Sequence, residues 1–123
     1  MKRILVVEDN EKNMYLIAFI LEKMGHRVLR AVTGEDGVEI AVRERPDLIL
    51  MDIQLPGIDG FEATRRIRAS AAAGGIPIVA VTSLAMTGDR ERLLAAGCNG
   101  YIEKPIDPGT IMAQIAGFLG EGS

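Results

Sequence analysis

Residues 48–52 read Leu-Ile-Leu-Met-Asp, four consecutive apolar side chains followed by an acid. A strand with one face in solvent would carry a polar residue at every second position, and this segment carries none before Asp52. Continuous apolarity is typical of a parallel strand that helices cover on both faces. The segment therefore predicts an α/β fold in which Asp52 stands at the carboxyl end of a central strand.

Four other segments predict the remaining strands of this sheet. Residues 4–7 and 76–81 are also strongly apolar, so they belong in the centre. Residues 27–31 mix polar and apolar side chains, which suits an edge strand, and residues 100–102 fit a short fifth strand. Parallel strands need crossover helices between them, and right-handed crossovers are expected.

Helix signals lie between these strands. The residues expected to cap or open the five helices are, in order, Asn10, Thr33, Asp59, Thr87 and Asp107. The buried face of the first helix is expected to consist of Met14, Ile17, Ala18 and Leu21. Five strand–helix units therefore predict one domain over residues 1–120, with residues 121–123 as a frayed tail.

Composition narrows the possible functions. The chain has 123 residues, of which 48% are hydrophobic, so it can form one core and is not disordered. A net charge of −3 without a basic stripe argues against nucleic-acid binding, and 4% aromatic residues offer few surfaces for a flavin. No apolar run reaches the roughly 20 residues of a membrane span. The apolar run near the start, residues 4–7, is too short for a signal peptide.

The cysteine and histidine content also limits the possibilities. Cys98 is the single cysteine, so no internal disulfide can form, and we expect it to be a packing residue in a reducing compartment. A cytoplasmic protein is the resulting expectation. His26 is the single histidine, and its place before the edge strand predicts a solvated side chain.

Polar residues follow the apolar strands where the strands would share one edge of the sheet. They are Glu8, Asp9, Asp52, Thr82, Ser83, Glu103 and Lys104. Ligands of parallel sheets bind at this edge, and carboxylates gathered there repel one another unless a cation neutralises them. Oxygen ligands without nearby His or Cys favour Mg²⁺. Together with a lysine and a hydroxyl, the set suits phosphoryl transfer to a carboxylate nucleophile.

These motifs, taken together, resemble the receiver domain of two-component response regulators over essentially the whole chain. The resemblance is carried by the acidic pair Glu8-Asp9, by Asp52 in Leu-Ile-Leu-Met-Asp-Ile-Gln-Leu-Pro, by Thr82, and by Lys104-Pro105, all in order. The surrounding segments are most similar to stand-alone regulators of the DivK type and to receivers of hybrid kinases. The resemblance implies a flavodoxin-like (βα)5 fold, with a five-stranded parallel sheet of order 2-1-3-4-5 and helices on both faces.

The resemblance also implies roles for the acidic residues. Asp52 would be the phosphoacceptor and would take a phosphoryl group from the phosphohistidine of a histidine kinase or phosphotransferase protein. Asp9, Asp52 and the backbone carbonyl of Gln54 would bind Mg²⁺, with Glu8 acting through a water molecule. The protein would be a signalling switch and not a metabolic enzyme, catalysing only its own phosphorylation and slow dephosphorylation.

Further implied residues bind the phosphoryl group and report it. Lys104 and Thr82 would contact its oxygens, and Ser83, where the family usually has Ala or Gly, would add a donor or narrow the access. Thr82 and Tyr101 would form the switch, and the bond before Pro105 would be cis. A downstream protein partner would then bind the surface of the fourth helix, fifth strand and fifth helix. We expect a monomer that acts through noncovalent binding, because the fifth helix ends near the C-terminus.

The first helix is the expected docking site for the phosphodonor. If Met14, Ile17, Ala18 and Leu21 cover the sheet, helical geometry at 100° per residue predicts that Leu16 and Ile20 project to the opposite side. Such exposed apolar surface next to the active-site edge suits a protein partner, which we favour over the alternative that neighbouring helices or loops cover both residues. The predicted docking residues are Asn10, Asn13, Leu16 and Ile20.

Five alternatives use the same fold or related chemistry. A Mg²⁺-dependent phosphohydrolase needs a second Asp two residues after the nucleophile, where this chain has Gln54. A flavin binder needs a phosphate loop after the first strand, where Glu8 and Asp9 stand instead. No Gly-x-x-x-x-Gly-Lys-Ser/Thr motif exists, which excludes a P-loop hydrolase. An adaptor that never takes phosphate, and a receiver cut from a hybrid kinase, stay open.

Overall fold

The computed structural model describes residues 1–83 and 87–120 of the chain. Five strands alternate with five helices in this part of the chain. The elements are β1 (Arg3–Val7), α1 (Glu11–Lys23), β2 (Arg27–Ala31), α2 (Gly34–Glu44), β3 (Leu48–Asp52), α3 (Gly60–Ala69), β4 (Ile78–Thr82), α4 (Thr87–Ala96), β5 (Gly100–Glu103) and α5 (Pro108–Phe118). The predicted tail at residues 121–123 lies outside the described residues.

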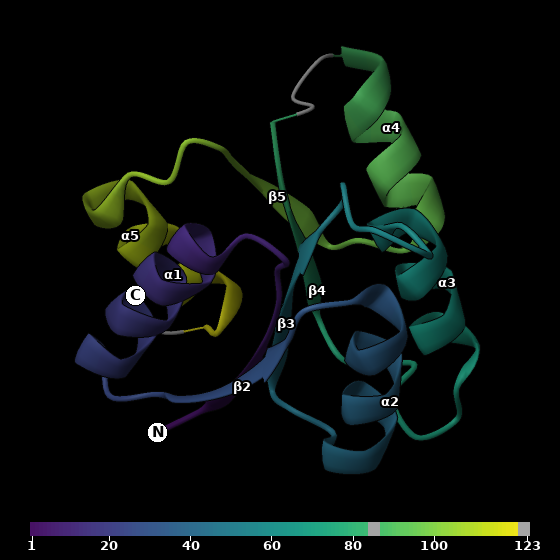
Figure 1. Ribbon diagram of the computed structural model, residues 1–123, viewed down its shortest axis with the longest axis horizontal. Helices are drawn as coiled ribbons and strands as arrows, with labels where there is room; N and C mark the ends of the chain where they lie inside the picture. The colour runs from purple at the N-terminus through teal and green to yellow at the C-terminus, as the bar shows by residue number, and fades with distance from the viewer. Residues whose placement is uncertain (84–86, 121–123) are drawn as a thin grey trace.

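The sheet is fully parallel and has the strand order β2-β1-β3-β4-β5. In Figure 1, α1 and α5 cover one face, and α2, α3 and α4 cover the other. The predicted α/β fold, its strand order and the edge position of β2 are confirmed. All strands run in one direction, so their carboxyl ends open onto a single edge of the sheet.

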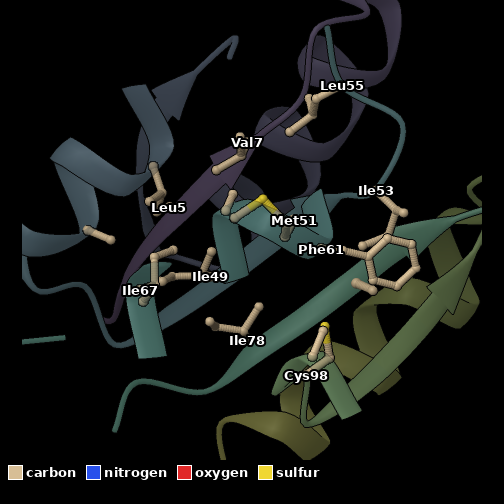
Figure 2. Close-up of a cluster of buried hydrophobic side chains, with 14 of the residues drawn as sticks. Leu5, Val7, Ile49, Met51, Ile53, Leu55, Phe61, Ile67, Ile78 and Cys98 are labelled. Atoms are coloured by element: carbon tan, nitrogen blue, oxygen red, sulfur yellow. The ribbon is translucent and has the colours of Figure 1, made fainter. Parts of the chain in front are cut away.

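Apolar strands form the core on both sides of the sheet. All five residues of β3 and all five of β4 are buried, which explains why neither segment alternates in sequence. On one face, Ile49 and Met51 pack with Phe61 and Ile67 of α3 (Figure 2). On the other face, Leu50 packs in the cluster that α1 and α5 complete. Each large apolar side chain buried in this way stabilises the fold by about 2 kcal/mol.

Four of the predicted N-caps form as expected, and all lie at the carboxyl edge of the sheet. In each, a side-chain oxygen accepts a hydrogen bond from the backbone N–H three residues later. The pairs are Asn10 with Asn13, Thr33 with Asp36, Asp59 with Glu62, and Asp107 with Thr110. These caps fix where each helix starts relative to the strand end before it.

Two expectations need correction, and both concern packing between elements. His26 is buried with 7% exposure, not solvated, because the turn before β2 folds against the start of the chain. Its Nδ1 accepts a hydrogen bond from the Lys2 N–H at 3.2 Å. The fourth strand runs from Ile78 to Thr82, two residues later than predicted at its start, since Ile76 belongs to the preceding turn and donates its N–H to Ala73. Cys98 is a buried free thiol, as predicted.

None of the helices in the described part of the chain has the length and apolarity that crossing a bilayer requires.

Candidate functional site

Three charged side chains converge at the carboxyl edge of the sheet. Glu8 follows β1, Asp52 ends β3 and Lys104 follows β5. The Nζ atom of Lys104 lies 3.1 Å from Glu8 Oε1 and 3.2 Å from Asp52 Oδ2. Residues far apart in the sequence therefore meet because neighbouring parallel strands end together.

The carboxylates outnumber the lysine. Glu8, Asp9 and Asp52 each offer an oxygen within 4.8 Å of the others. Glu8 is 1% exposed and Asp52 is 3% exposed, while Asp9 faces solvent. Burying several acids next to one cation is costly unless further positive charge binds. The geometry therefore favours a bound cation at this edge.

The electrostatics of the cluster show the same imbalance. Burial raises the pKa of Glu8, and a hydrogen bond to Asp52 and the charge of Asp52 raise it further in the same direction. The backbone of Asn10 and the charge of Lys104 act to lower it, and the resulting pKa is about 7. Burial alone would lower the pKa of Lys104, but the charges of Asp52 and Glu8 outweigh burial and raise it. The lysine is held charged, and Glu8 takes up a proton near neutral pH when no metal is bound.

The chemistry of the donors fits Mg²⁺. Every available ligand is an oxygen, and the structure describes no His or Cys side chain in the cluster. Glu8 Oε1 is buried and forms an ion pair with Lys104 Nζ at 3.1 Å. A carboxylate oxygen can accept more than one contact, so Oε1 can also bind an ion or a water held by the ion. Gln54 donates its N–H to Asp52 Oδ1 at 3.1 Å, which holds the start of the β3–α3 loop against the phosphoacceptor candidate.

The residues predicted to contact a phosphoryl group border the same edge. Thr82 ends β4 and is buried, and its carbonyl accepts the Lys104 N–H at 2.9 Å. The Lys104–Pro105 bond is cis, as predicted. Ser83 is exposed. Tyr101 is half-buried and packs against the cluster on the α3 face. Thr82 and Lys104 therefore lie at the carboxyl edge, Tyr101 lies within β5 opposite Ala80, and the roles of all these residues stay predictions.

The predicted docking residues on α1 need a correction. Ile20 is buried with 5% exposure, and Leu16 is half-buried against the same core cluster. The reason is that α5 packs beside α1 on the same face of the sheet (Figure 1), which widens the buried part of the helix. Asn10 is exposed and caps the helix, and Asn13 is half-buried.

Two aromatic residues instead form the exposed apolar surface of α1. Tyr15 is 72% exposed and Phe19 is 49% exposed, and their rings stack with centroids 6.3 Å apart. Lys23 Nζ lies 5.8 Å from the Phe19 ring centroid. The spacing of four residues between the two aromatics was the available signal, because it places both on one face of a helix.

Residues 4–116 match the response regulator receiver domain. The chain is 42% identical over 120 residues to the polar-differentiation response regulator DivK of Brucella anthropi, covering 98% of each chain. It is 41% identical to the receiver domain of sensor histidine kinase PA1611 from Pseudomonas aeruginosa, with a TM-score of 0.89 and 98% of each chain covered. That crystal structure has a magnesium ion coordinated in the active-site cleft.

Another solved relative was captured in an activated form. It is the BeF3-activated receiver domain of RstA from Klebsiella pneumoniae, which is 35% identical, with a TM-score of 0.86 over 95% of this chain and 97% of that one.

Fold and site together define a phosphoryl-transfer signalling domain and not a metabolic enzyme. The chain belongs to the response regulator receiver family, as its residues 4–116 show. It is a receiver of two-component phosphorelays and is similar to DivK along nearly its full length.

Proposed function

We propose that Asp52 is the phosphoacceptor of this receiver and that Mg²⁺ is its cofactor. The observation that carries the proposal is the position of Lys104 Nζ between Glu8 and Asp52 at the sheet edge. A buried carboxylate beside a charged lysine and further acids is suited to hold a transferred phosphoryl group between positive charges.

The two groups that exchange bonds in the reaction are the side chain of Asp52 and a phosphorylated imidazole. A carboxylate oxygen of Asp52 attacks the phosphorus atom, an O–P bond forms, and the N–P bond breaks with its electron pair returning to the imidazole nitrogen. The product is an acyl phosphate on Asp52 and a free histidine on the donor. Attack by water on the same phosphorus later releases inorganic phosphate and restores the carboxylate, which is the slow autodephosphorylation expected of the chain.

The metal would be held by Asp9, Asp52 and the carbonyl of Gln54, with Glu8 reached through water. Mg²⁺ supplies positive charge that offsets the charge of the phosphoryl oxygens. Lys104 stabilises the same charge from the opposite side, since its raised pKa keeps it protonated. Glu8, with a pKa of about 7 in the metal-free protein, gives up its proton when a cation binds.

Phosphorylation then changes the surface of α4, β5 and α5. The hydroxyl of Thr82 donates to a phosphoryl oxygen, Ser83 contributes at the rim, and the β4 end shifts relative to the half-buried Tyr101 ring. A groove of about 560 Å³ runs along this surface, lined in part by Tyr101, Glu103 and Gln114. A downstream protein partner binds there, and the chain acts as a cytoplasmic monomer.

The kinase or phosphotransferase docks on α1. Tyr15 lines a hollow of about 300 Å³ that also includes Asp9 and Glu11, so the exposed aromatic surface is continuous with the acidic cluster. Asn10 lies at the same end of the helix. A donor bound to this surface reaches Asp52 without crossing the molecule.

Phosphorylation assays test the acceptor. Wild type, Asp52→Asn and the control Asp89→Asn are incubated with Mg²⁺ and labelled acetyl phosphate. We expect uptake by wild type and Asp89→Asn and none by Asp52→Asn, because an amide is not a nucleophile at neutral pH. Label on folded Asp52→Asn equal to that on wild type would exclude Asp52 as the acceptor.

A second assay tests the docking surface. Tyr15→Ala should slow transfer from a phosphohistidine protein by about tenfold, which corresponds to the loss of one interface anchor, while uptake from acetyl phosphate is unchanged. Leu94→Ala is the matched control, because Leu94 is an exposed apolar residue on α4. Equal rates for Tyr15→Ala and wild type with the protein donor would remove α1 from the interface.

A further inference from the structure

The first turn of α2 packs against the β3–α3 loop and against β1 through two glycines, Gly34 and Gly37. A Cβ added at Gly34 would lie 2.7 Å from the carbonyl oxygen of Ile58 and 2.7 Å from its Cγ1. A Cβ added at Gly37 would lie 2.8 Å from Val7 Cγ2. Cβ atoms in proteins essentially never come within 3.0 Å of such neighbours. Both contacts therefore require glycine at the present spacing.

The Gly34 contact acts on the loop between β3 and α3. This loop begins at Ile53 and carries Gln54, whose N–H donates to Asp52 Oδ1 at 3.1 Å. Its other end is fixed by Gly60, which packs on the Asp52 carbonyl and donates its N–H to the Ile53 carbonyl at 2.9 Å. Both ends of the loop are held in this way, and the segment between them rests on α2 where Ile58 meets Gly34.

The Gly37 contact acts on the strand that carries the acidic pair. Val7 is the residue before Glu8, and it is 1% exposed. The Glu8 N–H donates to the carbonyl of Ala31 at 3.0 Å, and Ala31 ends the strand that leads into α2. Thr33 caps α2 and fixes the direction of its first turn. One helical turn therefore contacts both the loop that follows Asp52 and the strand that precedes the acidic pair, through Ile58 and Val7.

We propose that the first turn of α2, through Gly34 and Gly37, is a positioning element of the Mg²⁺ site. It sets the distance between the loop of Gln54 and the acidic pair after β1. The inference rests on the metal site of the proposed function, and neither glycine contacts the ion. One of the two atoms that a Cβ at Gly34 would meet at 2.7 Å is the backbone oxygen of Ile58, so a rotamer change of the Ile58 side chain alone cannot accommodate a new methyl group and the loop must shift.

The test compares Gly34→Ala with Gly100→Ala. A Cβ at Gly100 would lie 2.7 Å from the Phe118 ring, at the amino end of β5 and away from the site. Mg²⁺ is titrated into each phosphate-free protein and binding is followed by amide NMR shifts, while urea unfolding without metal reports stability. We expect the Mg²⁺ dissociation constant to rise about tenfold in Gly34→Ala, as for other residues that orient metal ligands. Gly100→Ala should lose stability and keep the wild-type constant.

A metal-free readout separates this inference from the metal site itself. The Gln54 amide resonance should move in Gly34→Ala and stay in place in Gly100→Ala, whether or not metal is added. If Gly34→Ala does not fold, Gly37→Ala replaces it, because its Cβ would lie 2.8 Å from Val7 Cγ2 at the second contact of the same turn. An unchanged dissociation constant and Gln54 resonance in either folded variant would overturn the inference. Failure of wild type to bind Mg²⁺ would instead overturn the proposed cofactor.

Discussion

Each end of the sheet holds one long cationic side chain, Arg68 at the amino end and Lys104 at the carboxyl end, and the two contact different kinds of acceptor. At the amino end, Arg68 of α3 donates hydrogen bonds of 2.6–3.0 Å to four oxygens from two other segments. These acceptors are the carbonyls of Gly97, Gly74 and Ile76 and the side chain of Asn99. All are neutral, so the guanidinium is matched to polar groups that need donors.

At the carboxyl end, Lys104 faces charged acceptors that outnumber it. Two carboxylates lie within 3.2 Å of Nζ, and Asp9 adds a third to the cluster. Adjacent acids repel, and the cost is accepted where a ligand will supply positive charge. The comparison indicates that the amino end is built for stability and the carboxyl end for binding. Removing Arg68 at the amino end should therefore lower stability, whereas removing a carboxylate of the acidic cluster at the carboxyl end should raise it.

The largest effect is expected at the amino end. Arg68→Ala should lower the free energy of unfolding by about 3 kcal/mol, because several partly buried carbonyls lose their donor. Arg68→Lys should recover only part of the loss, since an ammonium cannot reproduce the fork of donors. Urea unfolding measures both, and acetyl phosphate labelling of the folded variants should match wild type. Loss of labelling with stability intact would show that the two ends are not separate.

The next effect is pH dependence at the carboxyl end. Because the pKa of Glu8 is raised from 4.5 to about 7, the folded protein holds a proton between these values that the unfolded chain releases. The contribution is fully present below pH 4.5 and is lost as the pH rises through about 7, so the metal-free protein becomes less stable over this window. Glu8→Gln should flatten this slope in urea unfolding. An equally steep slope in the variant would assign the effect to another group.

Removing the Asp52 carboxylate tests directly whether the acidic cluster lowers the free energy of unfolding. Without metal, Asp52→Asn should raise the free energy of unfolding by about 1 to 2 kcal/mol, since it relieves repulsion at a site kept for function. The same variant should lose most of the thermal stabilisation that millimolar Mg²⁺ gives wild type. Calorimetry with and without Mg²⁺ measures both quantities. A destabilised Asp52→Asn would mean that the Lys104 ion pair outweighs the repulsion among the acids.

The smallest effect is expected for Asp59, which lies at the same end of the sheet as Asp52 but caps a helix. Asp59 caps α3 by accepting the Glu62 N–H at 2.9 Å, so Asp59→Ala should lower the free energy of unfolding by about 1 kcal/mol. Asp59→Asn keeps a good capping acceptor and should cost little. A loss as large in Asp59→Asn as in Asp59→Ala would show that charge, and not the cap, explains the contribution of this residue.

Local sequence patterns were sufficient to predict strand burial and helix starts, because both depend on residues that are close in the sequence. Continuous apolarity identified the buried strands, and N-caps three residues before their partners identified helix starts, because both depend on nearby residues. The convergence of Glu8, Asp52 and Lys104 was also predictable, since parallel strands end at a common edge. Environments that two distant elements decide together were predicted wrongly, as Ile20 under α5 and His26 beside Lys2 illustrate.

The sequence by itself therefore determined the class of fold and the set of charged residues at the carboxyl edge of the sheet. Its resemblance to receiver domains also predicted the strand order. Only the tertiary structure decided which side chains of α1 face solvent, since α5 comes from the other end of the chain. It also decided how closely Gly34 meets Ile58. The physical reason is that burial and close approach depend on the summed packing of elements far apart in sequence, whereas periodicity and capping act over a few residues.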